Sequence, residues 1–277
     1  MQLTSKKPLI IGSILLLLII FSGAYFFVQK KQSKEIVEPE QPVRRRISEP
    51  VNVIDISQRP VVSIIPHTDG NHLTIKILSL NKPANSAHYL LEYQAGSSLR
   101  GLEADLELAT LPVETEVFLG SCSAGGACTY DKDITGGNLL LTFIGDENYA
   151  VKTNWRYIEN IDRSDSIASW DAKFQLESSA LSSMKQIVVF NSPGYPTGIA
   201  QDLKMDHEPE IIGDHYAVSS TSSLSGEGKI TIRLATDSPE ATIIGYDGES
   251  WQSFPTTVQD KQAIASVKLL EFYTVIR

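Results

Sequence analysis

The two cysteines of this 277-residue chain, Cys122 and Cys128, bracket the small residues Ser-Ala-Gly-Gly-Ala. In an oxidising compartment this spacing favours a disulfide that fixes a tight turn, and so short a loop adds about 2–3 kcal/mol of stability at most. Two free thiols, or half of a metal site, are the alternatives. A metal site needs further His or Cys ligands, and the neighbouring sequence offers none. We therefore expect a Cys122–Cys128 disulfide.

The histidines do not stand at a spacing typical of metal binding or catalysis. No HExxH, HxH or Cys-His motif includes any of them, so we expect surface or strand positions rather than ligands. They are His67, His72, His88, His207 and His215.

Two acidic segments resemble cation sites, but each has a simpler interpretation. Asp131 to Gly136 resembles a calcium loop, yet it lacks a third oxygen ligand and has Thr142 where the bidentate Glu should stand, which favours a turn. For the second segment we expect a solvated loop; its members are Asp202, Asp206, Glu208 and Glu210. The sequence thus predicts no metal and no cofactor.

The sequence also lacks the local motifs of nucleophilic catalysis and nucleotide binding. There is no G-x-S-x-G elbow, and no Gly-rich loop leads from a predicted strand into a helix. Exposed tryptophans could bind glycans, although Trp at a strand end is more often packed in a core. The tryptophans are Trp155, Trp170 and Trp251. No catalytic residue is predicted.

The elements that would position these residues begin with a hydrophobic stretch, Leu9–Val28. It has no charge over about twenty residues, which matches the roughly 30 Å hydrocarbon core of a bilayer. We expect a transmembrane helix here, after a short basic N-terminus at residues 1–8, so the lipid bilayer is one partner. The alternative is a cleaved signal peptide, because Ser22-Gly23-Ala24 supplies small residues for a peptidase.

The sequence features that bear on the orientation of this helix in the membrane disagree with one another. More Lys and Arg follow the hydrophobic stretch than precede it, which alone favours a cytoplasmic C-terminal part. The likeness to an export signal, the acidic C-terminal part and the close cysteine pair favour the opposite side. We expect a single-pass plasma-membrane protein whose C-terminal part is extracytoplasmic.

The charge of the chain after residue 50 excludes one class of partner. Residues 51–277 carry 16 Lys and Arg against 29 Asp and Glu, a formal charge of −13. Nucleic-acid binding requires a basic surface, so no nucleic-acid partner is expected. Residues 29–50 contain three prolines, many charges and no apolar periodicity, as is typical of a linker.

From Val51 onward, short β-branched runs separated by turn residues predict an all-β fold. A polar stretch at 159–169 divides the runs, so we expect two antiparallel β-sandwich domains, at 51–158 and 170–277. The expected strands of the first are Val51–Ile56, Val61–Ile65, Leu73–Ile77, His88–Tyr93, Leu102–Leu108, Glu116–Leu119, Leu139–Ile144 and Tyr149–Tyr157. The second begins with the runs Lys173–Leu176 and Lys185–Phe190, and its expected strands are Ile211–Val218, Lys229–Leu234, Thr242–Tyr246, Gln252–Phe254, Ala263–Val267 and Phe272–Ile276.

The C-terminal half has a hydrophobic rhythm that ends in a Tyr246-Asp-Gly-Glu-Ser-Trp251 hairpin and a final Phe272-Tyr-Thr-Val-Ile276 strand. In this it resembles the β-sandwich module first known from ankyrins and netrin receptors and found in bacterial surface proteins. The resemblance implies a structural or interaction domain and transfers no site residue. The first domain is similar in outline to fibronectin-type or immunoglobulin-like sandwiches, without their wide cysteine pair.

Together these features predict an anchored envelope protein that displays β-sandwich domains for binding, adhesion or scaffolding of a protein or glycan partner. The alternative is an envelope enzyme, or an accessory subunit of a membrane complex, that processes polysaccharide or peptide. A deep cleft with convergent carboxylates or a Ser/His pair would favour the alternative.

Overall fold

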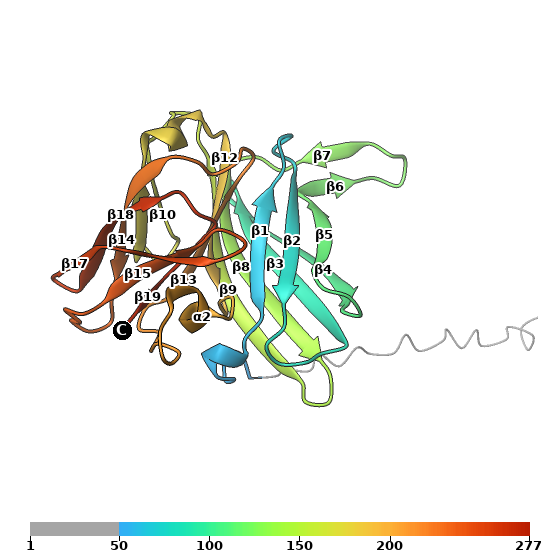
Figure 1. Cartoon of the computed structure of the whole chain (residues 1–277). Coiled ribbons are helices and arrows are strands. Elements are labelled where there is room, and N and C mark those ends of the chain that lie inside the picture. The colour runs from blue at the N-terminus through green and yellow to red at the C-terminus, as the bar shows by residue number, and fades with distance from the viewer. Residues whose placement is uncertain (1–49) are drawn as a thin grey trace, which may run out of the picture. The chain divides into compact units, whose positions relative to one another are not determined.

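The computed structural model describes residues 50–277, which form antiparallel β-sheets (Figure 1). The predicted membrane segment Leu9–Val28 and nearly all of the predicted linker lie outside the described residues. Within residues 50–277, no helix has the length and apolar character needed to span a bilayer. The expected all-β class is confirmed for this part of the chain.

The described strands group into four sheets. The largest has nine strands: β16 (Trp251–Phe254), β15 (Thr242–Tyr246), β19 (Phe272–Ile276), β13 (His215–Ser220), β12 (Gln186–Ser192), β9 (Tyr149–Glu159), β8 (Ile134–Ile144), β3 (Ser86–Ala95) and β4 (Ser98–Glu107), in that order. A three-stranded sheet contains β1 (Val61–Pro66), β2 (His72–Ser79) and β5 (Val113–Phe118). A five-stranded sheet contains β10 (Ser166–Ala168), β11 (Phe174–Glu177), β14 (Glu227–Arg233), β18 (Gln262–Lys268) and β17 (Thr256–Gln259). The fourth is a hairpin of β6 (Gly120–Cys122) and β7 (Cys128–Tyr130). The described helical turns are η1 (Ile56–Gln58), η2 (Ser179–Ser183) and α2 (Ile199–Leu203).

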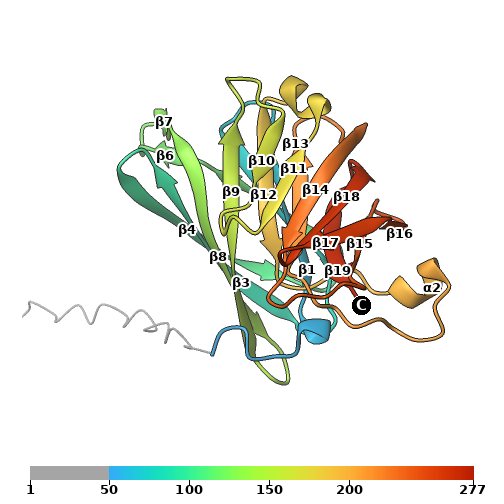
Figure 2. The ribbon, with the colours of Figure 1, turned by 90° about the vertical axis from the view of Figure 1, so that its left-hand side faces the viewer.

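The nine-stranded sheet is the middle of three layers. Its face toward the three-stranded sheet forms one hydrophobic cluster, in which Leu141 of β8 shares a core with Leu73 of β2. Its opposite face forms a second cluster with the five-stranded sheet, in which Ile187 of β12 shares a core with Ile230 of β14. Figure 2 shows β11, β14 and β18 on one side of β12 and β13, and β1 on the other.

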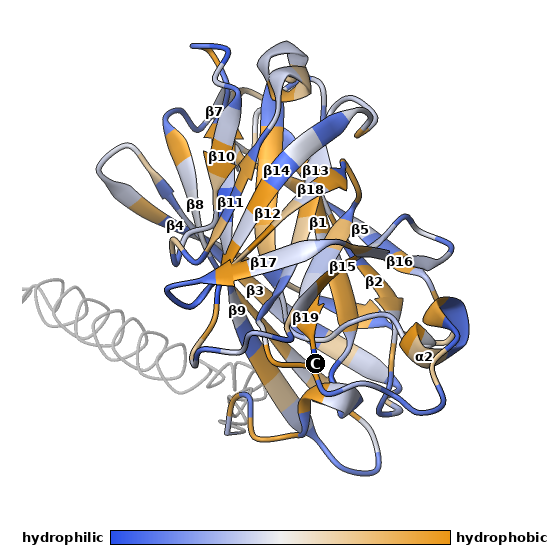
Figure 3. Ribbon diagram, turned by 60° about the vertical axis from the view of Figure 1, so that its left-hand side comes forward, coloured by the Kyte–Doolittle hydropathy of each residue, from blue (hydrophilic) through white to orange (hydrophobic). Residues whose placement is uncertain are grey.

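The hydrophobic pattern of each strand reflects how many of its faces are covered. In β3 every second residue is buried, as expected of a strand with one covered face. In β12 four consecutive residues, Ile187 to Phe190, are buried because alternate side chains enter the two clusters. Figure 3 shows hydrophobic residues along β12 and β14 and hydrophilic residues in the loops.

The polar stretch predicted to divide two domains, at 159–169, runs from the end of β9 through the whole of β10. The large sheet continues across it, because β9 pairs with β12 from Gln186↔Glu159 to Phe190↔Trp155. Asn160 holds the turn: its Nδ2 donates to the carbonyl oxygens of Ser164 and Leu181, at 3.1 and 2.9 Å. The two predicted sandwich halves therefore share one sheet, and residues 50–277 lie in one compact unit.

Two of the expected strands are wrong or too long. Val51–Ile56 forms a single bridge at Val51 and then turns into η1, because Asn52 has φ +60° and the Asp55 side chain caps the helical turn at Ser57. Ile211–Val218 becomes a strand only at His215, and Ile211 makes an isolated bridge to Ile276. In the first segment the Asp55 side chain bonds to nearby backbone, and in the second the N–H groups of Ile212 and Gly213 both donate to the Val275 carbonyl; an alternating pattern reveals neither.

Candidate binding site

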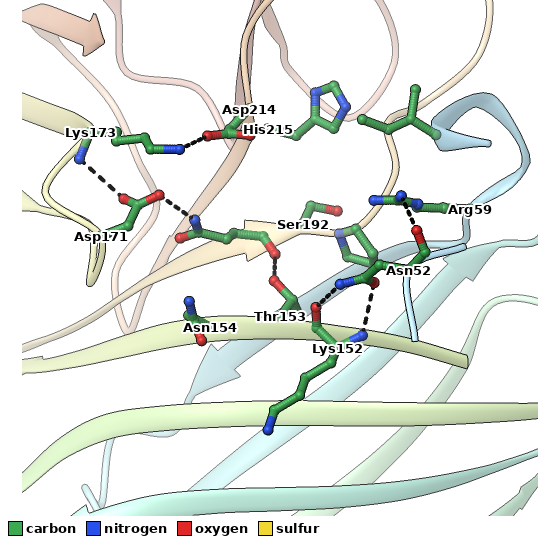
Figure 4. A pocket seen from close by; sticks show the side chains of 13 residues that line it. Asn52, Arg59, Lys152, Thr153, Asn154, Asp171, Lys173, Ser192, Asp214 and His215 are labelled. Carbon is green, nitrogen blue, oxygen red and sulfur yellow. Dashed lines mark hydrogen bonds and ion pairs between the residues drawn. The ribbon is translucent and has the colours of Figure 1, made fainter. Parts of the chain in front are cut away.

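A polar pocket of about 230 Å³ lies where segments from five parts of the chain meet. Its walls come from the segment before β1, from β9, from the end of β12, from the turn before β11 and from the start of β13. Figure 4 shows the Lys173–Asp214 pair on one side and Arg59 with Asn52 on the other. The lining residues are Asn52, Ile56, Arg59, Lys152, Thr153, Asn154, Asp171, Lys173, Asn191, Ser192, Pro193, Asp214 and His215.

The segment before β1 is held against β9 by Asn52. Its Nδ2 donates to the carbonyl of Lys152 at 2.9 Å, and its Oδ1 accepts from the Lys152 backbone N–H at 3.0 Å. Arg59 then donates to the carbonyls of Asn52 (2.9 Å) and Ile54 (3.1 Å). This part of the pocket wall is therefore fixed by hydrogen bonds between the Asn52 and Arg59 side chains and backbone groups.

Asp171 is a half-buried anion of the pocket. Its carboxylate accepts hydrogen bonds from the Lys173 backbone N–H at 3.1 Å, Asn191 Nδ2 at 2.9 Å, the Tyr216 hydroxyl at 3.2 Å and the Ser169 hydroxyl. Burial alone would raise the pKa of Asp171, but these hydrogen bonds outweigh it and lower the pKa. Asp171 therefore remains a carboxylate that can only accept hydrogen bonds.

The orientation of Asn191 follows from that of Asp171. Because the carboxylate only accepts, the amide nitrogen of Asn191 must face it, and the amide oxygen Oδ1 points elsewhere. This Oδ1 is buried and has no hydrogen-bond partner. Asn191 thus holds, in the wall of the pocket, a buried acceptor without a protein hydrogen-bond partner.

His215 brings the second unpaired acceptor. Its side chain is buried, with Nδ1 2.8 Å from the Thr274 hydroxyl, which itself donates to the Asp214 carbonyl at 3.5 Å. The hydroxyl proton is thereby used, so Nδ1 carries the ring proton and Nε2 is a lone-pair acceptor. Nε2 is buried and without a partner. Burial lowers the pKa of His215 to about 4, an effect that Asp214 opposes and Arg59 adds to, so the ring is neutral near pH 7.

The ion pair of Lys173 with Asp214, at 2.8 Å, lies on the rim of the pocket. Both side chains are about half exposed, so solvent screens the pair and it adds little stability. The partner does raise the pKa of Lys173, chiefly through the hydrogen bond to Asp214. This pair is therefore balanced, and the lining also holds the cations Arg59 and Lys152, the carboxylate of Asp171 and the neutral side chains of Asn191 and His215.

The residues singled out in the sequence are mostly placed away from this pocket. Cys122 and Cys128 are paired across the β6–β7 hairpin with their sulfur atoms 2.09 Å apart, at disulfide distance. Asp131 accepts from the Tyr93 hydroxyl at 2.8 Å and lies 3.3 Å from Arg100.

The acidic cluster does not converge on one point. Asp202 accepts from the Trp251 backbone N–H at 2.9 Å, Glu208 accepts from the Ala200 N–H at 3.4 Å, and Glu210 pairs with Arg277. Across residues 50–277, no three His, Cys, Asp or Glu side chains surround a metal position as they stand.

The histidines and tryptophans have different environments. His215 lines the pocket, His67 and His72 lie together at one end of the three-stranded sheet, and His88 contacts Glu103 and Asp105. Trp155 and Trp251 are buried in the core, as is typical of Trp at strand ends. Trp170 is 48% exposed and precedes Asp171 of the pocket in the chain.

Comparison of the chain with models of protein families, with curated proteins and with solved structures finds no match. The β-sandwich resemblance of the C-terminal half therefore stays a prediction. The site rests on its own geometry: two buried acceptors, one half-buried carboxylate and a Lys173–Asp214 ion pair at the rim.

Proposed function

We propose that this chain is a single-pass envelope protein whose extracytoplasmic β-sheet part binds a small, neutral, hydroxyl-rich ligand, such as a glycan unit. The hydrophobic stretch Leu9–Val28 and the linker after it support the anchored arrangement. The pair of unpartnered acceptors, Asn191 Oδ1 and His215 Nε2, carries the binding part of the proposal.

The chemistry of these acceptors selects the ligand class. A buried acceptor without a partner costs about 1–3 kcal/mol, and a ligand donor placed against it recovers that cost. Both unpaired atoms accept, so the ligand must present N–H or O–H groups. The Lys173–Asp214 pair is neutral in sum, and the lining as a whole has three cationic and two anionic side chains, so no large net charge selects an ionic ligand.

The test is ligand-observed NMR of the full-length chain in detergent micelles against a panel of neutral monosaccharides, amino sugars and polyols. We expect at least one sugar to bind, and His215→Leu, which removes the acceptor at similar size, to weaken that binding about tenfold, or about 1.4 kcal/mol. His88→Leu is the matched control, since His88 lies on β3, away from the pocket lining. A panel without any binder, or equal binding by His215→Leu and the unchanged chain, would contradict the proposal.

A further inference from the structure

A second polar cluster, independent of the pocket, lies at the end of the three-stranded sheet. His67 and His72 face each other across the turn between β1 and β2, where the His67 backbone N–H donates to the His72 carbonyl at 3.0 Å. Thr74 is opposite Glu116 on β5, and His72 is opposite Phe118. Residues two apart on a strand share a face, so His72, Thr74 and Glu116 project from the same, solvent-facing side.

The two imidazoles are held by their outer nitrogens. His72 Nδ1 lies 2.5 Å from Asp69 Oδ2, and Asp69 Oδ1 accepts from the backbone N–H groups of Asn71 (2.8 Å) and His72 (3.2 Å). His67 Nε2 lies 2.7 Å from the Thr74 hydroxyl. Histidines that bind metals are commonly oriented in this way, with the nitrogen away from the metal bonded to a carboxylate or another polar group.

The inner nitrogens both face one carboxylate. His67 Nδ1 is 3.7 Å from Glu116 Oε2, and His72 Nε2 is 3.8 Å from Glu116 Oε1. These distances exceed those of hydrogen bonds. They are close to the separation of about 3.3 Å between neighbouring ligand atoms around a tetrahedral zinc ion. The ring centroids are 5.9 Å apart, near the roughly 5–6 Å that two imidazoles on one such ion would show.

A carboxylate has no proton to give, so His72 Nδ1 donates to Asp69. In the neutral ring Nε2 is then the nitrogen with the lone pair, and it is the nitrogen that faces Glu116.

We propose that His67, His72 and Glu116 bind a divalent transition-metal ion of the zinc type. Two imidazole nitrogens and one carboxylate are a ligand set that zinc accepts, with a further position left open. The three groups do not enclose an ion as they stand, but Glu116 is 62% exposed and can rotate inward at small cost. Cysteine does not compete, because Cys122 and Cys128 are paired with each other and residues 1–49 contain neither Cys nor His.

The test is titration of the full-length chain, purified in detergent without a histidine tag, with zinc chloride followed by calorimetry. A parallel titration with cobalt(II) is followed by visible absorption, which reports coordination by nitrogen and oxygen at a low coordination number. We expect one ion per chain, with loss of saturable binding in His67→Ala and His72→Ala. Asp69→Asn should bind about tenfold more weakly, because the orienting hydrogen bond to His72 is weakened.

His88→Ala is the matched control, since His88 is similarly exposed and lies beside two carboxylates, Glu103 and Asp105, without a second histidine. Circular dichroism establishes that each variant is folded. The proposal would be overturned if the unchanged chain gave neither heat of zinc binding nor a cobalt spectrum. It would also be overturned if His67→Ala and His72→Ala bound as tightly as the unchanged chain, or if only His88→Ala lost binding.

Discussion

Asp171 and His215 line the same pocket, and burial shifts the pKa of both side chains, but Asp171 is charged at pH 7 and His215 is neutral. Burial raises the pKa of a carboxyl and lowers that of an imidazole, since each loses the water around its charged form. Asp171 has four hydrogen-bond donors, which reverse the effect and keep it ionised. His215 has one partner through Nδ1 and none through Nε2, so burial prevails and the ring stays neutral. The hydrogen-bond partners of the charged form therefore decide the charge of each group: Asp171 has donors for its carboxylate, whereas His215 has no acceptor for a second ring proton.

The lowered pKa of His215 predicts a dependence of stability on pH. The unfolded chain binds a proton at this residue below about pH 6.5, whereas the folded chain does not until about pH 4. The stabilisation due to neutral His215 is therefore complete above pH 6.5 and is lost as the pH falls toward 4, to an extent on the order of 3 kcal/mol.

Denaturant unfolding between pH 7 and pH 4 measures this effect. Carboxylates titrate over the same window, so the informative quantity is the difference between the chain and a His215→Asn variant, with His88→Asn as the control. We expect the difference in unfolding free energy to change across the window for His215→Asn and to stay flat for His88→Asn. A flat difference for both would show that His215 is not buried in its neutral form.

For single elements, the sequence predicts strands well where apolar residues alternate with polar ones or where a run is continuously apolar. Twelve of the fourteen expected strands correspond to observed strands over most of their length, because their signal is local. The sequence does not reveal the partners of the pocket residues: Asn191 bonds to Asp171, twenty positions away, and His215 to Thr274, fifty-nine positions away. The cluster of His67, His72 and Glu116 is hidden for the same reason, since β5 reaches β2 only through the sheet register.

The hairpin β6–β7 offers a test of compartment. Its residues from Ser121 to Tyr130 are exposed, so the cysteines are accessible to reagents. In intact cells we expect an external protease to cleave the C-terminal part, and an impermeant thiol reagent to label Cys122 and Cys128 only after reduction. A Cys122→Ser, Cys128→Ser variant should stay unlabelled in both conditions. Protection from protease, with both thiols labelled without reduction, would contradict the extracytoplasmic orientation.

At the scale of the whole molecule, the shared nine-stranded sheet determines how the two hydrophobic clusters are coupled. Neighbouring residues of β12 belong to different clusters: Val188 faces the three-stranded sheet and Val189 the five-stranded sheet. Loss of either small sheet would expose one face of β12 and β13, which are buried on both. Neither half of the chain can therefore unfold without exposing apolar surface of the other.

This coupling predicts a single cooperative thermal transition for residues 50–277 rather than one transition for each sandwich half. Val188→Ala and Val189→Ala each remove buried methyl groups, at about 2 kcal/mol, and each should lower that one midpoint by about 4–8 °C. Differential scanning calorimetry of the full-length chain measures this midpoint. Val258→Ala is the milder control, because Val258 is only partly buried and lies on the edge strand β17. Two resolved transitions, one moved only by Val188→Ala and the other only by Val189→Ala, would show two independent domains. A single transition moved by both variants follows from β12, whose backbone pairs with β9 of the first half and β13 of the second.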